Sequence, residues 1–194
     1  MKIILASKSG VRKQILDKYN IDNEVIVSNV DEDEVKESLL AEGADPLSVS
    51  KNLAEIKSIK VSNKNPDRYV LGADSVISLN KELINKPHSR EEALAILKKL
   101  NNSKHYLISS VCISKNGAMV WNHTDSSELK MKNLNDDELS SYLNKIETKT
   151  LTAYGVYQIE ADGLELFEYI KGDKDSIMGL PIKAIINYIK QLKK

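Results

Sequence analysis

Val70-Leu-Gly-Ala-Asp74-Ser-Val-Ile77 is the stretch of this 194-residue chain that decides the fold. Its Val, Ile and Leu residues continue to Leu79, which is typical of a buried β-strand. Gly72 and Asp74 interrupt the apolar run. A carboxylate in such a strand must be paired, bound to a metal or protonated, although a strand-end turn in which Asp74 bonds nearby backbone is an alternative. The stretch predicts a central strand and marks Asp74 as a candidate site residue.

Alternating strand and helix signals surround this segment. Upstream, a short apolar strand runs through a polar turn into residues at helical spacing; downstream, two long strands meet at Asn116-Gly117, a pair typical of hairpin turns. The expected strands are 2–6, 24–27, 69–79, 105–114, 119–131, 156–159 and 167–170, and the main helices are 11–19, 46–62, 89–100, 139–146 and 182–192. This order predicts an α/β fold with a mixed sheet, in one domain over residues 1–194.

Charge and hydropathy exclude several classes of protein. Lys and Arg together number 28, and so do Asp and Glu, so the net charge is zero. We therefore expect no nucleic-acid partner, because such proteins carry a basic footprint for phosphate contacts. No stretch approaches the ~20 apolar residues of a membrane span, and the apolar run 3–6 is too short for a signal peptide. We expect a cytoplasmic protein with no membrane partner.

Familiar catalytic patterns are also missing from the sequence. One cysteine and three scattered histidines give no zinc-spaced cluster and no serine–histidine triad. There is no Walker-type phosphate loop and no GxGxxG. The candidates that remain are polar residues at the ends of apolar strands, where ligands of α/β folds gather.

The turn after the first strand is one such candidate. Ser7 and Ser9 precede a helix whose free N–H groups and dipole form an anion site. Arg12, one turn into this helix, can reach back with a planar, two-pronged guanidinium. Simple N-capping by a serine, with an exposed arginine beside it, is the alternative.

Further candidates lie near the central strand and late in the chain. Magnesium-type ions take oxygen ligands and often bridge a carboxylate to phosphates, which suits Asp74. Lys57 lies on a helix and Lys86 in a loop fixed by the following proline, but surface lysines are common and each is weak evidence alone. The segment from Tyr157 to Glu160 alternates like a strand, which places these two side chains on opposite faces.

Six motifs follow one another in an order that resembles the Maf family. They are Leu5-Ala-Ser7-Lys-Ser9 with Arg12, Val30-Asp31-Glu32, Ala54-Glu-Ile-Lys57, Leu71-Gly-Ala-Asp74-Ser-Val76, Lys86-Pro87, and Ile170-Lys-Gly172-Asp173 through Gly179-Leu-Pro181. The resemblance extends from residue 3 to about residue 185, nearly the whole chain.

The resemblance implies a fold and an activity. Maf proteins share the fold of inosine triphosphate pyrophosphatases: an elongated mixed β-sheet flanked by helices, with two lobes around a cleft. They hydrolyse nucleoside triphosphates to the monophosphate and pyrophosphate with a divalent cation, Mg²⁺ or Mn²⁺, and characterised members prefer dTTP and UTP, or 7-methyl-GTP. For this chain it implies a nucleoside triphosphate substrate, a divalent metal cofactor and a homodimer.

The resemblance also implies roles for individual residues. Phosphates would be bound by Ser7, Arg12, Lys57 and Lys86, and the metal by Glu32 and Asp74, with Asp74 also the proton acceptor. The physical requirement agrees, because hydrolysis between the α- and β-phosphates must neutralise about four negative charges. An ionised carboxylate can then orient or deprotonate the attacking water.

The chain departs from the family pattern at four places, two of which are Asn85 instead of the glycine before Lys86 and Ser75 instead of a threonine. Gly10-Val-Arg12 stands where Pro-Arg-Arg is usual, and Gln158-Ile-Glu160 where Gly-Ile-Gln is common. The second form looks like a branch found in alpha-proteobacteria, and Glu160 is expected to contact the substrate base or the metal. These departures motivate a second hypothesis, a nucleotide-binding regulator of cell division with little turnover. A nucleotidyltransferase is a third.

Overall fold

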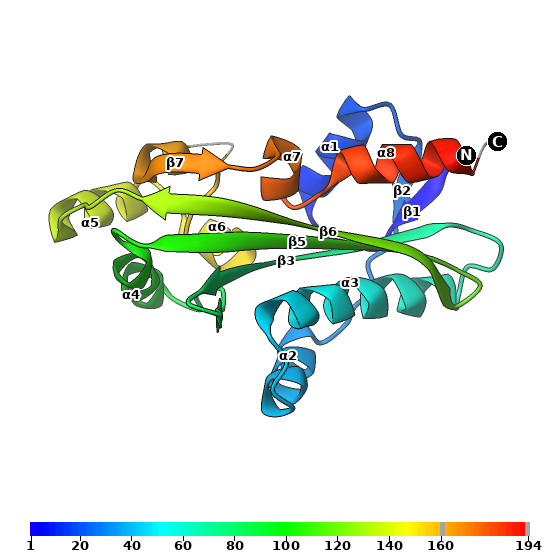
Figure 1. The fold of residues 1–194 in the computed structure, drawn as a ribbon, viewed down its shortest axis with the longest axis horizontal. Helices are drawn as coiled ribbons and strands as arrows, with labels where there is room; N and C mark the ends of the chain where they lie inside the picture. Colours follow the sequence, from blue (N-terminus) through cyan, green and yellow to red (C-terminus); the bar gives the residue numbers. More distant parts are fainter. Residues whose placement is uncertain (160–161, 193–194) are drawn as a thin grey trace.

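A seven-stranded mixed sheet forms the centre of the protein in a computed structural model, which describes residues 1–159 and 162–192 (Figure 1). The strand order is β2-β1-β3-β5-β6-β7, and β4 pairs with β3 off this path. The strands are β1 (Ile3–Leu5), β2 (Asn23–Val25), β3 (Val70–Leu79), β4 (Glu82–Ile84), β5 (Lys104–Lys115), β6 (Ala118–Met131) and β7 (Phe167–Lys171). β1 pairs in parallel with β2 and β3, and the other pairs are antiparallel. The expected mixed α/β fold is confirmed.

Helices cover both faces of this sheet. They are α1 (Gly10–Lys18), α2 (Glu32–Ala41), α3 (Pro46–Ser62), α4 (Arg90–Leu100), α5 (Asp136–Asn144), α6 (Thr148–Tyr154), α7 (Lys174–Ile177) and α8 (Ile182–Gln191), with a 3-10 helix at Asp162–Leu166. In Figure 1, α3 runs along one face of β3 and β5, while α1 and α8 lie on the other. α2 hangs below α3, away from the sheet.

Two hydrophobic cores divide the molecule into two lobes along the length of the sheet. One core joins α1 and α8 to the first half of β3 through residues such as Leu16, Leu71 and Ile185. The other joins α4, α5 and α6 to the far ends of β3 and β6, where Leu97 and Leu129 are fully buried. β3 and β5 pass through both lobes (Figure 1), so side chains in the middle of β3 lie between the two cores.

One edge of β3 is shared by two short strands with a gap between them. β5 pairs with one edge of β3 along residues 70–78. On the opposite edge, β1 pairs only with Val70 and Leu71, and β4 only with residues 77–79. Within the described chain, residues 72–76 therefore lack a strand partner on that edge. Asp74 lies at the centre of this gap.

The segment before the last strand differs from expectation. Residues 156–159 are not a strand; they follow α6, which the sequence reading treated as irregular, and Gly155 turns the chain with a φ of 99°. Tyr157 and Ile159 are nevertheless buried in the second core, as the alternation predicts. Packing against this core, rather than pairing with a sheet edge, satisfies the apolar side chains.

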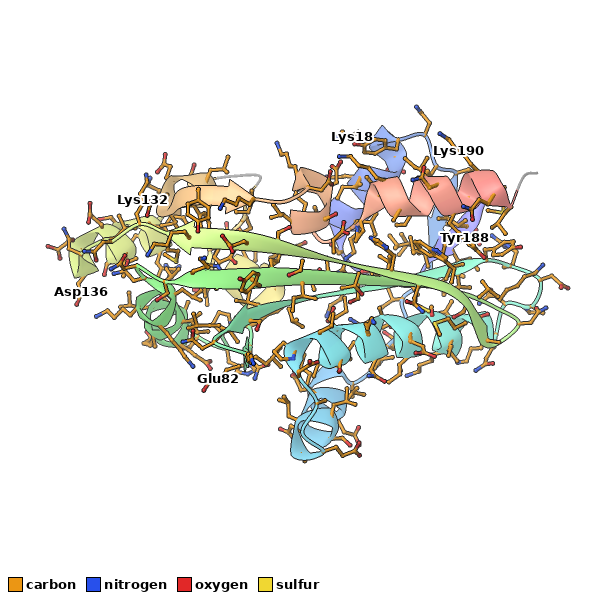
Figure 2. The ribbon with its side chains drawn as sticks, in the orientation of Figure 1. Lys18, Glu82, Lys132, Asp136, Tyr188 and Lys190 are labelled. Atoms are coloured by element: carbon orange, nitrogen blue, oxygen red, sulfur yellow. The ribbon has the colours of Figure 1, made fainter. Side chains whose placement is uncertain are left out.

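The outer surface carries charges of both signs. Figure 2 shows labelled side chains such as Lys18, Glu82, Asp136 and Lys190 spread along the periphery of the molecule. In the part of the chain that the structure describes, no helix is both long enough and apolar enough to cross a membrane.

Candidate active site

A cleft of about 440 Å³ opens over the gap in the edge of β3 and takes its walls from both lobes. It contains six of the residues singled out from the sequence, which are Ser7, Arg12, Glu32, Lys57, Asp74 and Lys86. The seventh, Glu160, lies outside the described residues. Its neighbours Gln158 and Ile159 line the cleft. Segments far apart in the sequence therefore converge on one site.

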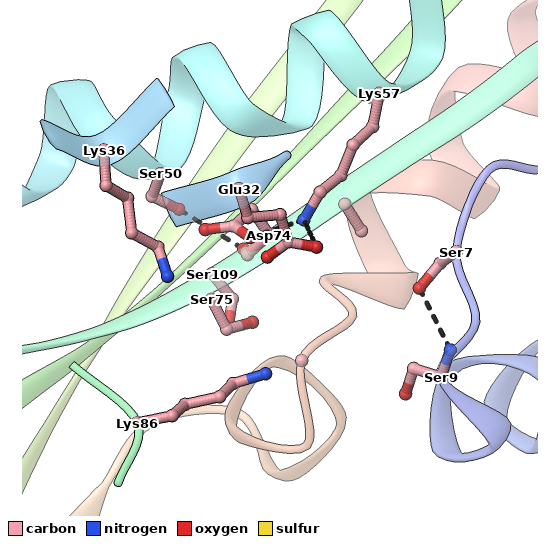
Figure 3. A network of polar contacts seen from close by, with 12 residues as sticks. Ser7, Ser9, Glu32, Lys36, Ser50, Lys57, Asp74, Ser75, Lys86 and Ser109 are labelled. Carbon is pink, nitrogen blue, oxygen red and sulfur yellow. Dashed lines mark hydrogen bonds and ion pairs between the residues drawn. The ribbon is translucent and has the colours of Figure 1, made fainter. Parts of the chain in front are cut away.

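Asp74, Lys57 and Glu32 form an ionic triad at the centre of the cleft, with Lys57 and Asp74 buried and Glu32 partly exposed (Figure 3). The Lys57 ammonium lies 2.8 Å from Asp74 Oδ1 and 2.9 Å from Glu32 Oε1. Lys57 and Asp74 are each only 5% exposed. Burial opposes ionisation of Glu32, but the nearby lysines, Lys57 first among them, together hold the pKa of Glu32 below its ordinary value. The expectation that a buried Asp74 must be paired is met by Lys57.

The second oxygen of Asp74 is different. Oδ2 is buried and has no hydrogen-bond partner within the described part of the chain. A buried carboxylate oxygen without a partner is costly, so the site is built to receive a further group there. Two carboxylates suit a magnesium-type ion that also takes waters and substrate phosphates. Among the described residues, no cluster of three or more His, Cys, Asp or Glu side chains could hold a metal by itself.

Gly72 brings Lys57 within reach of Asp74. A Cβ at this position would lie 2.1 Å from the Ala54 carbonyl oxygen and 2.8 Å from the Ser58 nitrogen, both on α3. Only glycine lets the helix backbone approach the strand this closely. Residues 72 and 74 share one face of β3, so the face that admits α3 also carries the carboxylate.

Arg12 binds the free edge of β3 and the start of the last helix. Its guanidinium donates to Ala73 O (3.0 Å), Gly179 O (2.9 Å) and the hydroxyl oxygens of Ser7 (3.1 Å) and Ser75 (3.2 Å). Four hydrogen bonds leave at most one of five N–H groups for a ligand. Removal from water lowers the pKa of Arg12, which Asp74 and Glu32 partly offset. In this arrangement Arg12 joins three segments as well as lining the cleft.

The turn after β1 forms the second wall of the cleft. Ser9 caps α1 by accepting a hydrogen bond from the Arg12 N–H, as the capping alternative predicted. Ser7 accepts hydrogen bonds from the Ser9 N–H at 3.2 Å and from Arg12. Its hydroxyl proton remains available to donate. The serines therefore fix the turn while keeping a donor directed at the cleft.

Three further lysines, Lys8, Lys36 and Lys86, line the cleft, and the sequence predicted a role only for Lys86. Lys86 has an exposed stem, but its ammonium donates to Ala153 O at 2.8 Å. Desolvation by the cleft walls lowers the pKa of Lys86, and Glu32 opposes this shift. Lys36 on α2 also lines the cleft, with a side chain only 14% exposed. Its position four residues after Glu32, on the same helix face, was the available signal.

The far end of the cleft is apolar. It is lined by residues of β3, α4, β5 and the segment after α6, including Ile77, Ile96, Leu107, Val156 and Ile159. Tyr157 contributes to this wall, and its hydroxyl lies 2.9 Å from Nε2 of the buried His105. A polar, cationic end and an apolar end in one cleft fit a ligand with a phosphate group and a flat apolar part.

The whole chain is similar in sequence to known proteins. The family model described as Maf-like protein matches residues 2–192. A nucleoside triphosphate pyrophosphatase of Pelagibacter ubique is 58% identical over 99% of this chain and 98% of its own length. A 7-methyl-GTP pyrophosphatase of Brucella abortus is 35% identical over 100% of this chain and 97% of its own length.

Solved structures give a weaker likeness. A HAM1 protein from Coxiella burnetii is 14% identical, with a TM-score of 0.44, over 68% of this chain and 73% of that one. Family membership rests instead on the sequence matches, which cover the whole site as well as the fold. The chain belongs to the Maf-like protein family.

Proposed function

We propose that this chain hydrolyses nucleoside triphosphates to the monophosphate and pyrophosphate in the cleft over β3. Its relatives are named nucleoside triphosphate pyrophosphatase and 7-methyl-GTP pyrophosphatase. The cleft has an anion-binding end and an apolar end, which suits a nucleotide with its phosphates and its base. Asp74, between the two ends, would lie where the phosphates meet the nucleoside.

The unpartnered oxygen of Asp74 carries this proposal. Oδ1 accepts a hydrogen bond from Lys57, which fixes the direction of the carboxylate, while Oδ2 has no hydrogen-bond partner among the described residues and can accept one. A carboxylate held in this way can accept a proton from water. The water oxygen then bonds to one phosphorus of the α–β bridge, and the bridging oxygen leaves with the other phosphate.

A divalent metal is the cofactor that this site fits. Glu32 and Asp74 would hold it, and phosphate oxygens and waters would complete the oxygen ligands that Mg²⁺ or Mn²⁺ prefers. When bound, the metal would neutralise charge on the phosphates and on the leaving pyrophosphate. The protein itself supplies Lys57, Lys86 and the Ser7 hydroxyl for the remaining charge.

Asp74→Asn tests the proposal, because it keeps the shape of the side chain and removes the proton acceptor. We expect pyrophosphate release to fall by about three orders of magnitude or more, since general-base catalysis alone contributes about 10²–10⁴-fold. Substrates should include UTP, dTTP, GTP and 7-methyl-GTP, each with Mg²⁺ and with Mn²⁺. Full activity in a folded Asp74→Asn protein would contradict the role of Asp74.

The same substrate panel separates the other hypotheses. Tight nucleotide binding with no pyrophosphate from any substrate would favour the regulator of cell division. Pyrophosphate that appears only when an acceptor such as a sugar phosphate is added would favour a nucleotidyltransferase. Assembly as a homodimer, and a contact between Glu160 and the substrate base or the metal, remain predictions from the sequence, and sedimentation and a Glu160→Gln variant would test them.

A further inference from the structure

Most cations of the cleft are already bound to the protein. Lys57 pairs with two carboxylates, and Arg12 makes four hydrogen bonds to protein oxygens. Lys86 donates to a carbonyl oxygen. A triphosphate needs charge that is free to turn toward it. Among the described cleft cations, Lys36 is the one whose side chain is largely buried and yet only weakly bound to the protein; Lys8 also lines the cleft, but it is exposed.

The contacts of the Lys36 side chain within the protein contribute little to the stability of the fold. Its ion pair is with Asp33 on the same helix, at 3.5 Å, and the Asp33 side chain is 73% exposed. Such exposed pairs at short helical spacing contribute only about 0.3–0.5 kcal/mol. Yet the Lys36 side chain is only 14% exposed and lines the cleft. Burying a lysine in this way is unfavourable unless the charge meets a partner.

The direction of Lys36 places its charge among the site groups. Figure 3 shows its stem running from α2 toward the space between Glu32, Ser75 and Lys86. Lys36 and Lys86 both line the cleft beside Glu32. Two ammonium groups that face one space repel each other, and an anion bound between them would relieve this repulsion.

The position of Lys36 also indicates which phosphate it meets. In Figure 3 the turn of Ser7 and Ser9 lies on the opposite side of Asp74 from Lys36. Lys86, which shares the space with Lys36, bonds to Ala153 at the start of the segment that forms the apolar end. If the base occupies the apolar end, Lys36 and Lys86 lie on the nucleoside side of Asp74, and the serine turn lies on the pyrophosphate side.

We propose that Lys36 is a substrate-binding residue that contacts the phosphate attached to the nucleoside, the group that stays on the monophosphate product. The assignment rests on the proposed function for the identity of the ligand. It concerns binding alone, so it is tested without turnover.

The experiment is calorimetric titration of wild type, Lys36→Met and Lys36→Arg with UMP, GMP and 7-methyl-GMP, with their nucleosides, and with pyrophosphate. Methionine keeps the length of the apolar stem and removes the charge. For the monophosphate that wild type binds most tightly, we expect Kd to rise by about tenfold in Lys36→Met, as for a lost hydrogen bond to a charged group. The Kd of the nucleoside and of pyrophosphate should change by less than about threefold, and Lys36→Arg should retain most of the affinity.

Asp33→Asn is the matched control, because it breaks the ion pair of Lys36 and leaves the lysine in place. If Lys36 acts only by stabilising α2, Asp33→Asn will weaken monophosphate binding as much as Lys36→Met, and the proposal fails. It also fails if Lys36→Met leaves the monophosphate Kd unchanged or weakens pyrophosphate equally. Wild-type protein that shows the expected binding pattern but releases no pyrophosphate would refute the proposed function alone.

Discussion

Lys57→Met removes the ammonium that separates two carboxylates in the cleft, and we expect it to destabilise the protein strongly. Lys57 Nζ lies 2.9 Å from Glu32 Oε1 and 2.8 Å from Asp74 Oδ1. Without it, the two oxygens face each other at most about 6 Å apart, where like charges repel by about 3 kcal/mol at an effective dielectric constant of about 20. Breaking a buried ion pair costs about 3–5 kcal/mol. We therefore expect the free energy of unfolding near neutral pH to fall by about 3–4 kcal/mol.

The pH dependence gives this prediction a second signature. In the wild type, the nearby lysines, Lys57 first among them, hold the pKa of Glu32 below its ordinary value of 4.5 despite the opposing effect of burial. Glu32 therefore stabilises the fold above that value, and its contribution is lost as the pH falls through the folded-state pKa. In Lys57→Met, burial and repulsion raise the pKa of Glu32, so the variant regains stability as the pH falls toward about 4.5. Its deficit relative to wild type should shrink on acidification.

Urea unfolding in metal-free buffer, followed by the fluorescence of Trp121, measures both effects. The curves are recorded between about pH 5 and pH 8 for wild type, Lys57→Met, Asp74→Asn and the double variant. Asparagine removes the repulsion, so the double variant should be more stable than Lys57→Met by about 2 kcal/mol. A loss of stability in Lys57→Met below about 1 kcal/mol would refute the reasoning. So would a loss that is equal at both ends of the pH range and is not reduced in the double variant with Asp74→Asn.

Three other substitutions test the frame around the site. Gly72→Ala places a Cβ 2.1 Å from the Ala54 carbonyl oxygen, so α3 must move. We expect the free energy of unfolding, measured in urea, to fall by about 3 kcal/mol or more, together with a loss of activity. A variant as stable as the wild type would contradict the close approach of α3 to β3. Desolvation lowers the pKa of His105 to about 4. The free energy of unfolding of the wild type should therefore fall by roughly 3 kcal/mol as the pH falls from about 6.5 to about 4, and His105→Gln should lack this fall. Parallel curves of stability against pH for the two proteins would contradict the prediction. Arg12→Lys keeps the charge but removes the planar guanidinium that makes these hydrogen bonds. Thermal unfolding should show a loss of stability of about 2–4 kcal/mol, and the KM for the nucleotide should rise. An unchanged melting temperature would show that these hydrogen bonds contribute little.

Much of the fold was predictable from local patterns. The strand around Val70–Leu79, the hairpin at Asn116-Gly117 and the helix after Pro46 all occur where periodicity and turn residues placed them. Asn116 and Gly117 have φ values of 52° and 75°, the left-handed backbone that this residue pair favours. α6 was missed, and residues 156–159 were taken for a strand, because a short apolar alternation fits either a sheet edge or a loop packed on a core.

Site residues were predictable as chemical types but not as partners. The position of Asp74 in an apolar strand predicted that its buried carboxylate would require a counter-charge. That Lys57 supplies this charge depends on Gly72, which lets α3 approach β3. Arg12 was expected to bind phosphate, and the structure shows most of its donors bonded to backbone and hydroxyl oxygens instead. The only sequence signal for the proposed role of Lys36 is its position four residues after Glu32, and this signal is weak because a lone lysine on a charged helix is usually solvated.

The sequence by itself determined most of the long strands and helices, the central strand and the family, because periodicity and ordered motifs are local properties of the chain. Only the tertiary structure decided where the cleft opens. β1 and β4 take different parts of one edge of β3 and leave residues 72–76 between them without a strand partner on that edge, within the described chain. Strand pairing is a contact between distant segments, so no local pattern encodes the gap. That gap, and the two cores on either side of it, give Asp74 its position between the cationic and apolar ends of the cleft.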